Sequence, residues 1–232
     1  LNPQEVLEFG KIASREYRAL GIATALSPQI DLSTEPRWRR FADTFGEHTR
    51  LAVEMTKAYW DGFQTTEGSA DGWGEESVNT MVKHFPGGGP CEGGRDAHYA
   101  YGKYAVYPGG NFEEHLRPFS EGAFALEGGT QSASAVMPYY TISYGQDKEN
   151  GENVGNSFSR YLIGNLLREQ LGYDGVVCTD WGITHNTGKT EEEFAGKCWG
   201  VEELTIEERH LKALEAGVDP FGGKYDIKPV LE

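Results

Sequence analysis

The fold is decided by Tyr173-Asp174-Gly175-Val176-Val177-Cys178-Thr179-Asp180-Trp181-Gly182, a stretch in the last third of the 232-residue chain. A turn ends at Gly175, and the apolar, β-branched pair Val176 and Val177 predicts a short buried strand. The strand runs into the carboxylate of Asp180, with Trp181 beside it. An Asp in this place can simply begin the next turn or cap a helix. In parallel α/β folds, however, the carboxyl end of a strand is also where ligands bind.

Strands and helices alternate along the rest of the chain, which is typical of a parallel α/β fold. The pattern predicts helices over 2–20, 46–63, 112–126, 157–170 and 205–214, and further strands over 22–26, 78–85, 133–139 and 216–219. Capping motifs mark the start of the first and last helices. No dinucleotide fingerprint follows the first strand, and Gly87-Gly88-Gly89 lacks the Lys of a phosphate loop. Because several strands end in polar side chains, we expect a TIM-barrel-like (β/α)8 fold. About five of its eight units are present, so residues 1–232 form a partial barrel.

Composition excludes some classes of function. The net charge is −15 and the pI about 4.8, which argues against binding nucleic acid or an anionic membrane surface. No apolar run is long enough to span a membrane. The odd number of cysteines, three, fits no metal motif and no disulfide framework. We therefore expect no metal and no cofactor. An acidic, aromatic-rich chain is compatible with neutral polar ligands such as sugars.

The beginning of the chain, Leu1-Asn2-Pro3, carries neither a starting Met nor a signal peptide. It therefore suggests a piece of a longer protein. The cysteines leave the compartment open, and we favour a secreted or periplasmic location over a cytoplasmic one.

In a barrel, the strand ends converge on one face. They would bring together Arg40, Lys83-His84, Met137 to Tyr140, and Asp180-Trp181. Each has a plain structural alternative: a solvated loop charge for Arg40, a structural pair for Lys83-His84, and a core tyrosine for Tyr140. Together they predict a polar pocket with aromatic walls around one carboxylate. Such a pocket suits a sugar whose anomeric carbon the carboxylate can attack.

At these residues the chain resembles family 3 glycoside hydrolases, the group of exo-acting β-glucosidases and their relatives. Four segments carry the resemblance, in the family's order: Arg37-Trp38-Arg39-Arg40, Lys83-His84-Phe85-Pro86-Gly87-Gly88-Gly89, Val136-Met137-Pro138-Tyr139-Tyr140, and the Asp180 stretch. Two departures stand out, because Arg39 replaces a usual Gly and Thr179 a usual Ser. The family's early strand, with an Asp that grips distal hydroxyls, has no counterpart.

The resemblance implies a role for each matching residue. Asp180 would be the nucleophile of a retaining mechanism, and Tyr140 would steady it. The remaining matches would bind or enclose the terminal sugar: Arg40, Lys83, His84 and Arg95 through its hydroxyls, Trp181 and Met137 as walls, and His98 by touching the sugar or ordering its loop.

A retaining enzyme also needs a general acid/base about 5–5.5 Å from the nucleophile. In the two-domain β-glucosidases of this family it is a Glu from a second α/β domain, which this chain does not contain. In the β-N-acetylglucosaminidase branch it is a His paired with an Asp, which Asp96-Ala97-His98 resembles.

We therefore expect hydrolysis of terminal non-reducing β-D-glucosyl residues by a retaining double displacement. The expected partners are a β-glucoside or oligosaccharide substrate, the remainder of the barrel, and a second domain or chain that supplies the acid. Open strand edges also allow a homo-oligomer. The alternatives are a β-N-acetylglucosaminidase that uses Asp96 and His98, and a sugar-binding fragment without turnover.

Overall fold

A four-stranded parallel sheet forms the centre of the computed structural model, which describes residues 2–231. Its strands follow chain order across the sheet: β1 (Thr24–Ala25), β2 (Asn79–Phe85), β4 (Ala135–Pro138) and β6 (Val176–Val177). Each strand is added on the same side of the previous one, so the order never reverses as it does in a doubly wound sheet. This is the winding of a β/α barrel, and the predicted TIM-barrel-like fold is confirmed.

The predicted last strand over 216–219 is wrong. Ala216 still belongs to the helix α4 (Ile206–Ala216), which ends where Gly217 takes a left-handed conformation. The segment that follows nevertheless lies beside β6, because Asp219 N donates to Val177 O at 2.8 Å and Thr179 N donates to Pro220 O at 3.1 Å. A fifth segment thus lies at the edge of the sheet without forming a regular strand.

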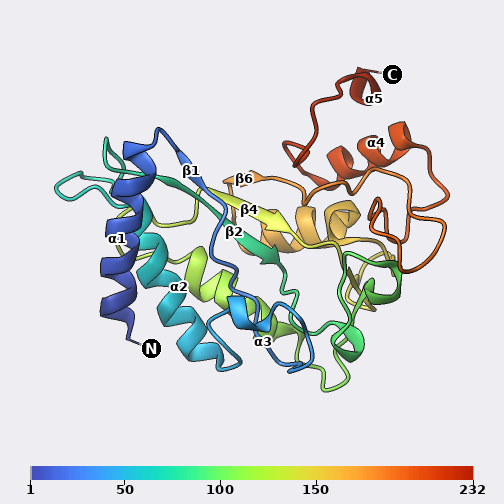
Figure 1. The fold of residues 1–232 in the computed structure, drawn as a ribbon, viewed down its shortest axis with the longest axis horizontal. Helices are drawn as coiled ribbons and strands as arrows, with labels where there is room; N and C mark the ends of the chain where they lie inside the picture. Colours follow the sequence, from blue (N-terminus) through green and yellow to red (C-terminus); the bar gives the residue numbers. More distant parts are fainter. Residues whose placement is uncertain (1, 232) are drawn as a thin grey trace.

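Helices cover the outer face of the sheet. On one flank α1 (Pro3–Ala19) lies alongside α2 (Thr49–Gln64), and α4 lies on the opposite flank (Figure 1). The axes of α1 and α2 approach closely at Gly10 and Gly62, where a Cβ on Gly62 would lie 2.6 Å from Leu7 O. Both predicted caps are present, at Asn2 for α1 and as a capping box between Thr205 and Glu208 for α4.

Two predicted helices are wound differently from a plain α-helix. The first begins as α3 (Phe112–Arg117) and continues from Pro118 as the π-helix η4 (Pro118–Ala123). The second is the π-helix η6 (Tyr161–Gln170). The remaining helical elements are short: η1 (Phe41–Asp43), η2 (Glu92–Gly94), η3 (Ala100–Gly102), η5 (Asn156–Phe158) and α5 (Lys228–Leu231).

The two faces of the sheet bury different residues. Val82, Val136 and Val177 point outward into the main core beneath the helices. Their neighbours in the alternating strand pattern, including Met81, Ala135 and Met137, form a small separate cluster on the inner face. All three cysteines are buried and free, and Cys178 belongs to this inner cluster.

A second, two-stranded parallel sheet ties together the loops beyond β2 and β4. It pairs β3 (Tyr104–Ala105) with β5 (Ile142–Ser143). Because both loops leave the carboxyl ends of their strands, this small sheet fixes the chain around the end of the barrel where Asp180 lies.

Candidate active site

Asp180 lies directly beyond β6, with only 7% of the residue exposed. Its Oδ1 accepts a hydrogen bond of 2.7 Å from the backbone N–H of Trp181, and Tyr140 lies beside the same carboxylate. Burial, followed by the neighbouring Asp180 carboxylate, raises the pKa of Tyr140. The hydroxyl therefore keeps its proton and faces Asp180 as a neutral group. The Trp181 N–H orients the carboxylate, with the Tyr140 hydroxyl beside it.

His84 is the middle member of a row of three side chains, between Asp31 and Arg40. Its Nδ1 lies 2.9 Å from Oδ2 of the fully buried Asp31, and its Nε2 lies 3.2 Å from Nη1 of Arg40. A guanidinium can only donate, so Nε2 carries the lone pair and Nδ1–H donates to Asp31. Burial lowers the pKa of His84, and Arg40 acts in the same direction against Asp31. His84 is therefore neutral, and at 4.0 Å from Asp180 Oδ2 it makes no hydrogen bond to that carboxylate.

Asp31 also holds the backbone around His84. Its Oδ1 accepts from His84 N at 3.2 Å and from the N–H of Gly88. Burial opposes ionisation of Asp31, but His84, Gly88 and Arg40 outweigh it and lower the pKa of that carboxyl. The glycine run after β2 is thus pinned to the same acid that selects the proton position on His84.

Lys83 supplies a cation near Asp180. It pairs with Met137 in the register of β2 and β4, so both side chains lie on the inner face of the sheet. Burial lowers the pKa of Lys83 and nearby Arg40 lowers it further, while Asp180 raises it. The Lys83 ammonium makes no hydrogen bond or ion pair with any residue from 2 to 231, which leaves its donors available to a ligand.

Trp181 and Met137 bound this region in different ways. Met137 is buried in the inner cluster, whereas Trp181 is 41% exposed. The indole lies against the backbone of Gly222 and Gly223, and a Cβ on Gly222 would lie 2.8 Å from its Cε3. Glycine at these positions therefore lets the ring lie flat against the chain and present its other side outward.

A cleft of about 340 Å³ opens beside Arg40. His98 and Asp96 line it, and His98 Nδ1 lies 2.7 Å from Asp96 Oδ1. The imidazole packs edge-on against Tyr140 at 4.9 Å and stacks with Phe194 at 5.9 Å. His98 is therefore held by a carboxylate on one nitrogen and packs against Tyr140, the tyrosine beside Asp180.

Arg95 is the one candidate that the structure does not bring to this cluster. Its side chain is 56% exposed and lies 3.9 Å from Glu92, and it does not line the cleft. Its role in holding a sugar stays a prediction.

Two residues of the site were missed by sequence reasoning. Asp31 lies between the buried Ile30 and Leu32, and an acid within an apolar alternation was the signal that could have revealed it. Lys197 is 5% exposed and faces the Phe194 and Tyr140 rings. Nothing in its sequence neighbourhood distinguishes it from a surface lysine.

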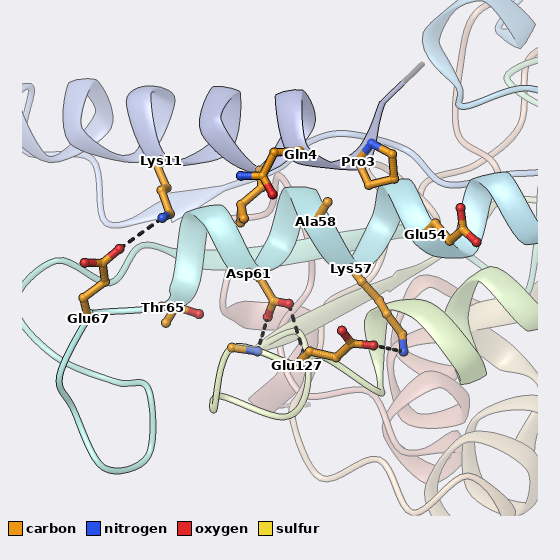
Figure 2. Close-up of a pocket in the computed structure, with 12 residues that line it drawn as sticks. Pro3, Gln4, Lys11, Glu54, Lys57, Ala58, Asp61, Thr65, Glu67 and Glu127 are labelled. Atoms are coloured by element: carbon orange, nitrogen blue, oxygen red, sulfur yellow. Dashed lines mark hydrogen bonds and ion pairs between the residues drawn. The ribbon is translucent and has the colours of Figure 1, made fainter.

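A second groove, of about 470 Å³, lies between α1, α2 and the turn at Glu127 (Figure 2). Its charged groups already have partners: Lys11 binds Glu67 at 3.0 Å and Lys57 binds Glu127 at 2.8 Å. Asp61 accepts hydrogen bonds from two backbone N–H groups of the turn. Because these charges are satisfied internally and no predicted site residue lines the groove, we assign the chemistry to the Asp180 region.

A strand-end carboxylate with cations and aromatic walls on a barrel is the arrangement of a glycoside hydrolase. The chain belongs to glycosyl hydrolase family 3, whose N-terminal domain matches residues 1–221. It is 47% identical over 223 residues to beta-glucosidase C of Emericella nidulans, and 43% identical over 232 residues to a periplasmic beta-glucosidase/beta-xylosidase of Dickeya chrysanthemi. These matches cover 96% and 95% of the chain, but 34% of each relative.

A solved structure agrees with this assignment. The family 3 beta-N-acetylglucosaminidase from Paenibacillus sp. superposes with a TM-score of 0.71 at 25% identity, over 95% of this chain and 36% of that one. The chain therefore spans about a third of the length of the curated relatives it matches. Among residues 2–231, no helix combines the length and apolar character that crossing a membrane requires.

Proposed function

We propose that the protein containing this chain hydrolyses terminal non-reducing β-D-glucosyl residues by a retaining double displacement. The observation that carries the proposal is the Asp180 carboxylate, oriented by the Trp181 N–H and surrounded by Tyr140, Lys83 and Arg40. The similarity to beta-glucosidases at 43–47% identity supports the glucoside as substrate. Similarity to a periplasmic relative supports a secreted or periplasmic location.

In the first step, an Asp180 oxygen attacks the anomeric carbon while the bond to the leaving oxygen breaks and a general acid protonates that oxygen. The product is a glycosyl ester of Asp180. In the second step, the same group removes a proton from water, the water oxygen attacks the anomeric carbon, and Asp180 is released. Arg40 and Lys83 provide N–H donors for the sugar hydroxyls, and Trp181 provides an apolar wall.

His84 is not the general acid in this scheme. Its single proton is directed at Asp31 and its lone pair at Arg40. We propose that the acid is a carboxyl group outside residues 1–232, in a second domain or chain, and that the remaining units of the barrel close the sheet. The length of the relatives supports this proposal.

A second candidate is β-N-acetylglucosaminidase activity with His98 as the acid/base. The 2.7 Å contact between Asp96 and His98 favours it, because a carboxylate on one imidazole nitrogen orients the other for proton transfer. The two candidates differ in their response to His98→Ala. Under the second candidate, that change abolishes hydrolysis of an unactivated 2-acetamido substrate but spares one with a good leaving group. Under the first, it weakens activated and unactivated glucosides alike, because it removes a contact near the sugar and not the acid.

The decisive experiment uses this chain together with its natural flanking sequence, which we call the extended protein. It is incubated with a 2-deoxy-2-fluoro-β-glucoside that carries a good leaving group, and its intact mass is measured. We expect a mass increase of one fluoroglucosyl group, located at Asp180 by peptide mapping. The label should be absent in Asp180→Ala and retained in the control Asp174→Ala, an exposed acid of the same stretch. A folded wild type that stays unlabelled contradicts glucosidase chemistry, and a 2-acetamido substrate then tests the second candidate.

A further inference from the structure

Lys197 is a buried cation without a hydrogen-bonding partner. The residue is 5% exposed, and its ammonium lies 3.8 Å from the centre of the Phe194 ring and 5.6 Å from that of Tyr140. No hydrogen bond or ion pair joins this ammonium to any residue between 2 and 231. Ring faces attract a cation but do not accept three N–H donors in the way oxygen atoms do.

The surroundings of this ammonium are those of the reaction centre. Tyr140, one of its two ring partners, lies beside Asp180, and Phe194, the other, lines the cleft with His98. Burial lowers the pKa of Lys197, whereas Asp180 and Asp96 raise it. The ammonium therefore lies within electrostatic reach of both the nucleophile and the acid that holds His98.

The position of Lys197 is built into the fold. Its backbone N–H donates to Gly182 O at 3.1 Å, and Trp199 Nε1 donates to Ala97 O at 3.0 Å, which ties this loop to the loop of Asp96 and His98. Arg209 of α4 is buried beneath the loop and donates to Val201 O at 3.1 Å and Glu202 O at 2.6 Å. The loop is thus anchored on both sides of Lys197.

We propose that Lys197 is a substrate-binding residue whose ammonium donates a hydrogen bond to one hydroxyl of the bound sugar. A neutral hydroxyl suits this lysine better than an anionic group, because Asp180 and Asp96 already balance its charge. The inference rests on the proposed function for the identity of the sugar, which is glucose.

The test is a calorimetric titration of the extended protein with D-glucose and with its 2-, 3-, 4- and 6-deoxy analogues. Lys197→Met keeps the length of the side chain but removes the donors. We expect it to weaken glucose binding roughly 10- to 100-fold, the effect of losing a hydrogen bond from a charged donor. One deoxy analogue should bind wild type and Lys197→Met equally, because it lacks the hydroxyl that Lys197 contacts.

Two further variants keep the test decisive. Lys189→Met, in an exposed part of the same loop, should bind every sugar like wild type. Lys197→Gln, which retains N–H donors without the charge, replaces Lys197→Met if the latter does not fold, and should show a smaller loss confined to the same hydroxyl. A loss spread evenly over glucose and all four analogues, no loss, or no glucose binding by wild type overturns the proposal.

The outcome is independent of turnover. If glucose binding depends on Lys197 but no fluoroglucosyl ester forms on Asp180, the proposed function fails and the Lys197 assignment stands. If the ester forms and Lys197→Met binds all five sugars like wild type, the proposed function stands and the Lys197 assignment fails.

Discussion

At the scale of single residues, the proposed mechanism makes the Tyr140 hydroxyl a determinant of how well Asp180 serves as nucleophile and as leaving group. The neutral hydroxyl lies beside the carboxylate, and a hydrogen bond that it donates to the departing anion would contribute about 1.5–3 kcal/mol. In the second half of a double displacement the carboxylate leaves as an anion, and a donor that stabilises this anion speeds its departure. Tyr140 is therefore expected to matter most for release of the sugar from Asp180.

Tyr140→Phe removes that donor and keeps the ring. We expect kcat of the extended protein on an aryl β-glucoside to fall roughly 10- to 100-fold, because about 1.4 kcal/mol corresponds to a tenfold change in rate. The glycosyl ester should accumulate, so KM should fall too and stopped-flow measurements should show a burst. Tyr144→Phe, which alters an exposed tyrosine, serves as the control. Unchanged kcat in Tyr140→Phe would show that the hydroxyl does not support catalysis.

The residues of the site differ in how far the sequence predicts them. Asp180 and His84 occur in recognisable local patterns, and the structure brings both to one end of the sheet. Asp31 and Lys197 act through contacts with residues distant in sequence, namely His84 and Tyr140. Such contacts exist only after folding, and each residue's immediate neighbours in the chain do not specify them.

At the scale of secondary structure, sequence motifs predict where a helix begins better than whether it is an α-helix or a π-helix. Capping residues located the beginnings of α1 and α4 because they satisfy backbone groups through near neighbours. The predicted helix over 112–126 was less accurate, since the winding changes at Pro118, a residue that cannot donate a backbone hydrogen bond. The apolar pattern over 216–219 resembled a strand, but its first residue still belongs to α4.

His115 makes α3 sensitive to acid. The residue is fully buried, its Nδ1 has no hydrogen-bonding partner, and its Nε2 lies 3.4 Å from Thr34 Oγ1. Burial lowers the pKa of His115 from 6.5 to about 4, against the influence of Asp31 and Glu114. Between these values the unfolded chain takes up a proton that the folded chain excludes. Neutral His115 therefore makes its full contribution to the free energy of unfolding above about pH 6.5. That contribution is lost as the pH falls towards 4.

His115→Gln should remove this part of the acid sensitivity. One pH unit of separation between the folded and unfolded pKa corresponds to about 1.4 kcal/mol, so the variant should gain about 3 kcal/mol relative to wild type between pH 7 and pH 4. Urea unfolding of the extended protein at a series of pH values measures this difference. His48→Asn, an exposed position where Asn can still cap α2, is the control. Parallel stability curves for wild type and His115→Gln would contradict the prediction.

At the scale of the whole molecule, the sheet is open on its inner face and at the edge formed by β1. Val176 pairs with Ala135 in the strand register, so it belongs to the inner face, and it is 44% exposed. Leu26, two residues beyond Thr24 of β1, is 37% exposed. In a closed barrel, strands and inner side chains would cover both residues. Apolar exposure of this kind favours association, either with the rest of a barrel or with another copy of the chain.

The isolated 232-residue chain should therefore self-associate, and one substitution should act in opposite directions in the two contexts. Val176→Thr lowers the apolar area of the inner face while keeping a β-branched residue in β6. We expect it to raise the monomer fraction of the isolated chain in sedimentation velocity. In the extended protein it should instead lower the free energy of unfolding by about 1 kcal/mol, because there the position is covered and the hydroxyl is buried.

Leu211→Gln, on the exposed side of α4, controls for the general loss of apolar surface and should leave both measurements nearly unchanged. A monomeric isolated chain with a sharp two-state unfolding transition would show that the open sheet is stable by itself.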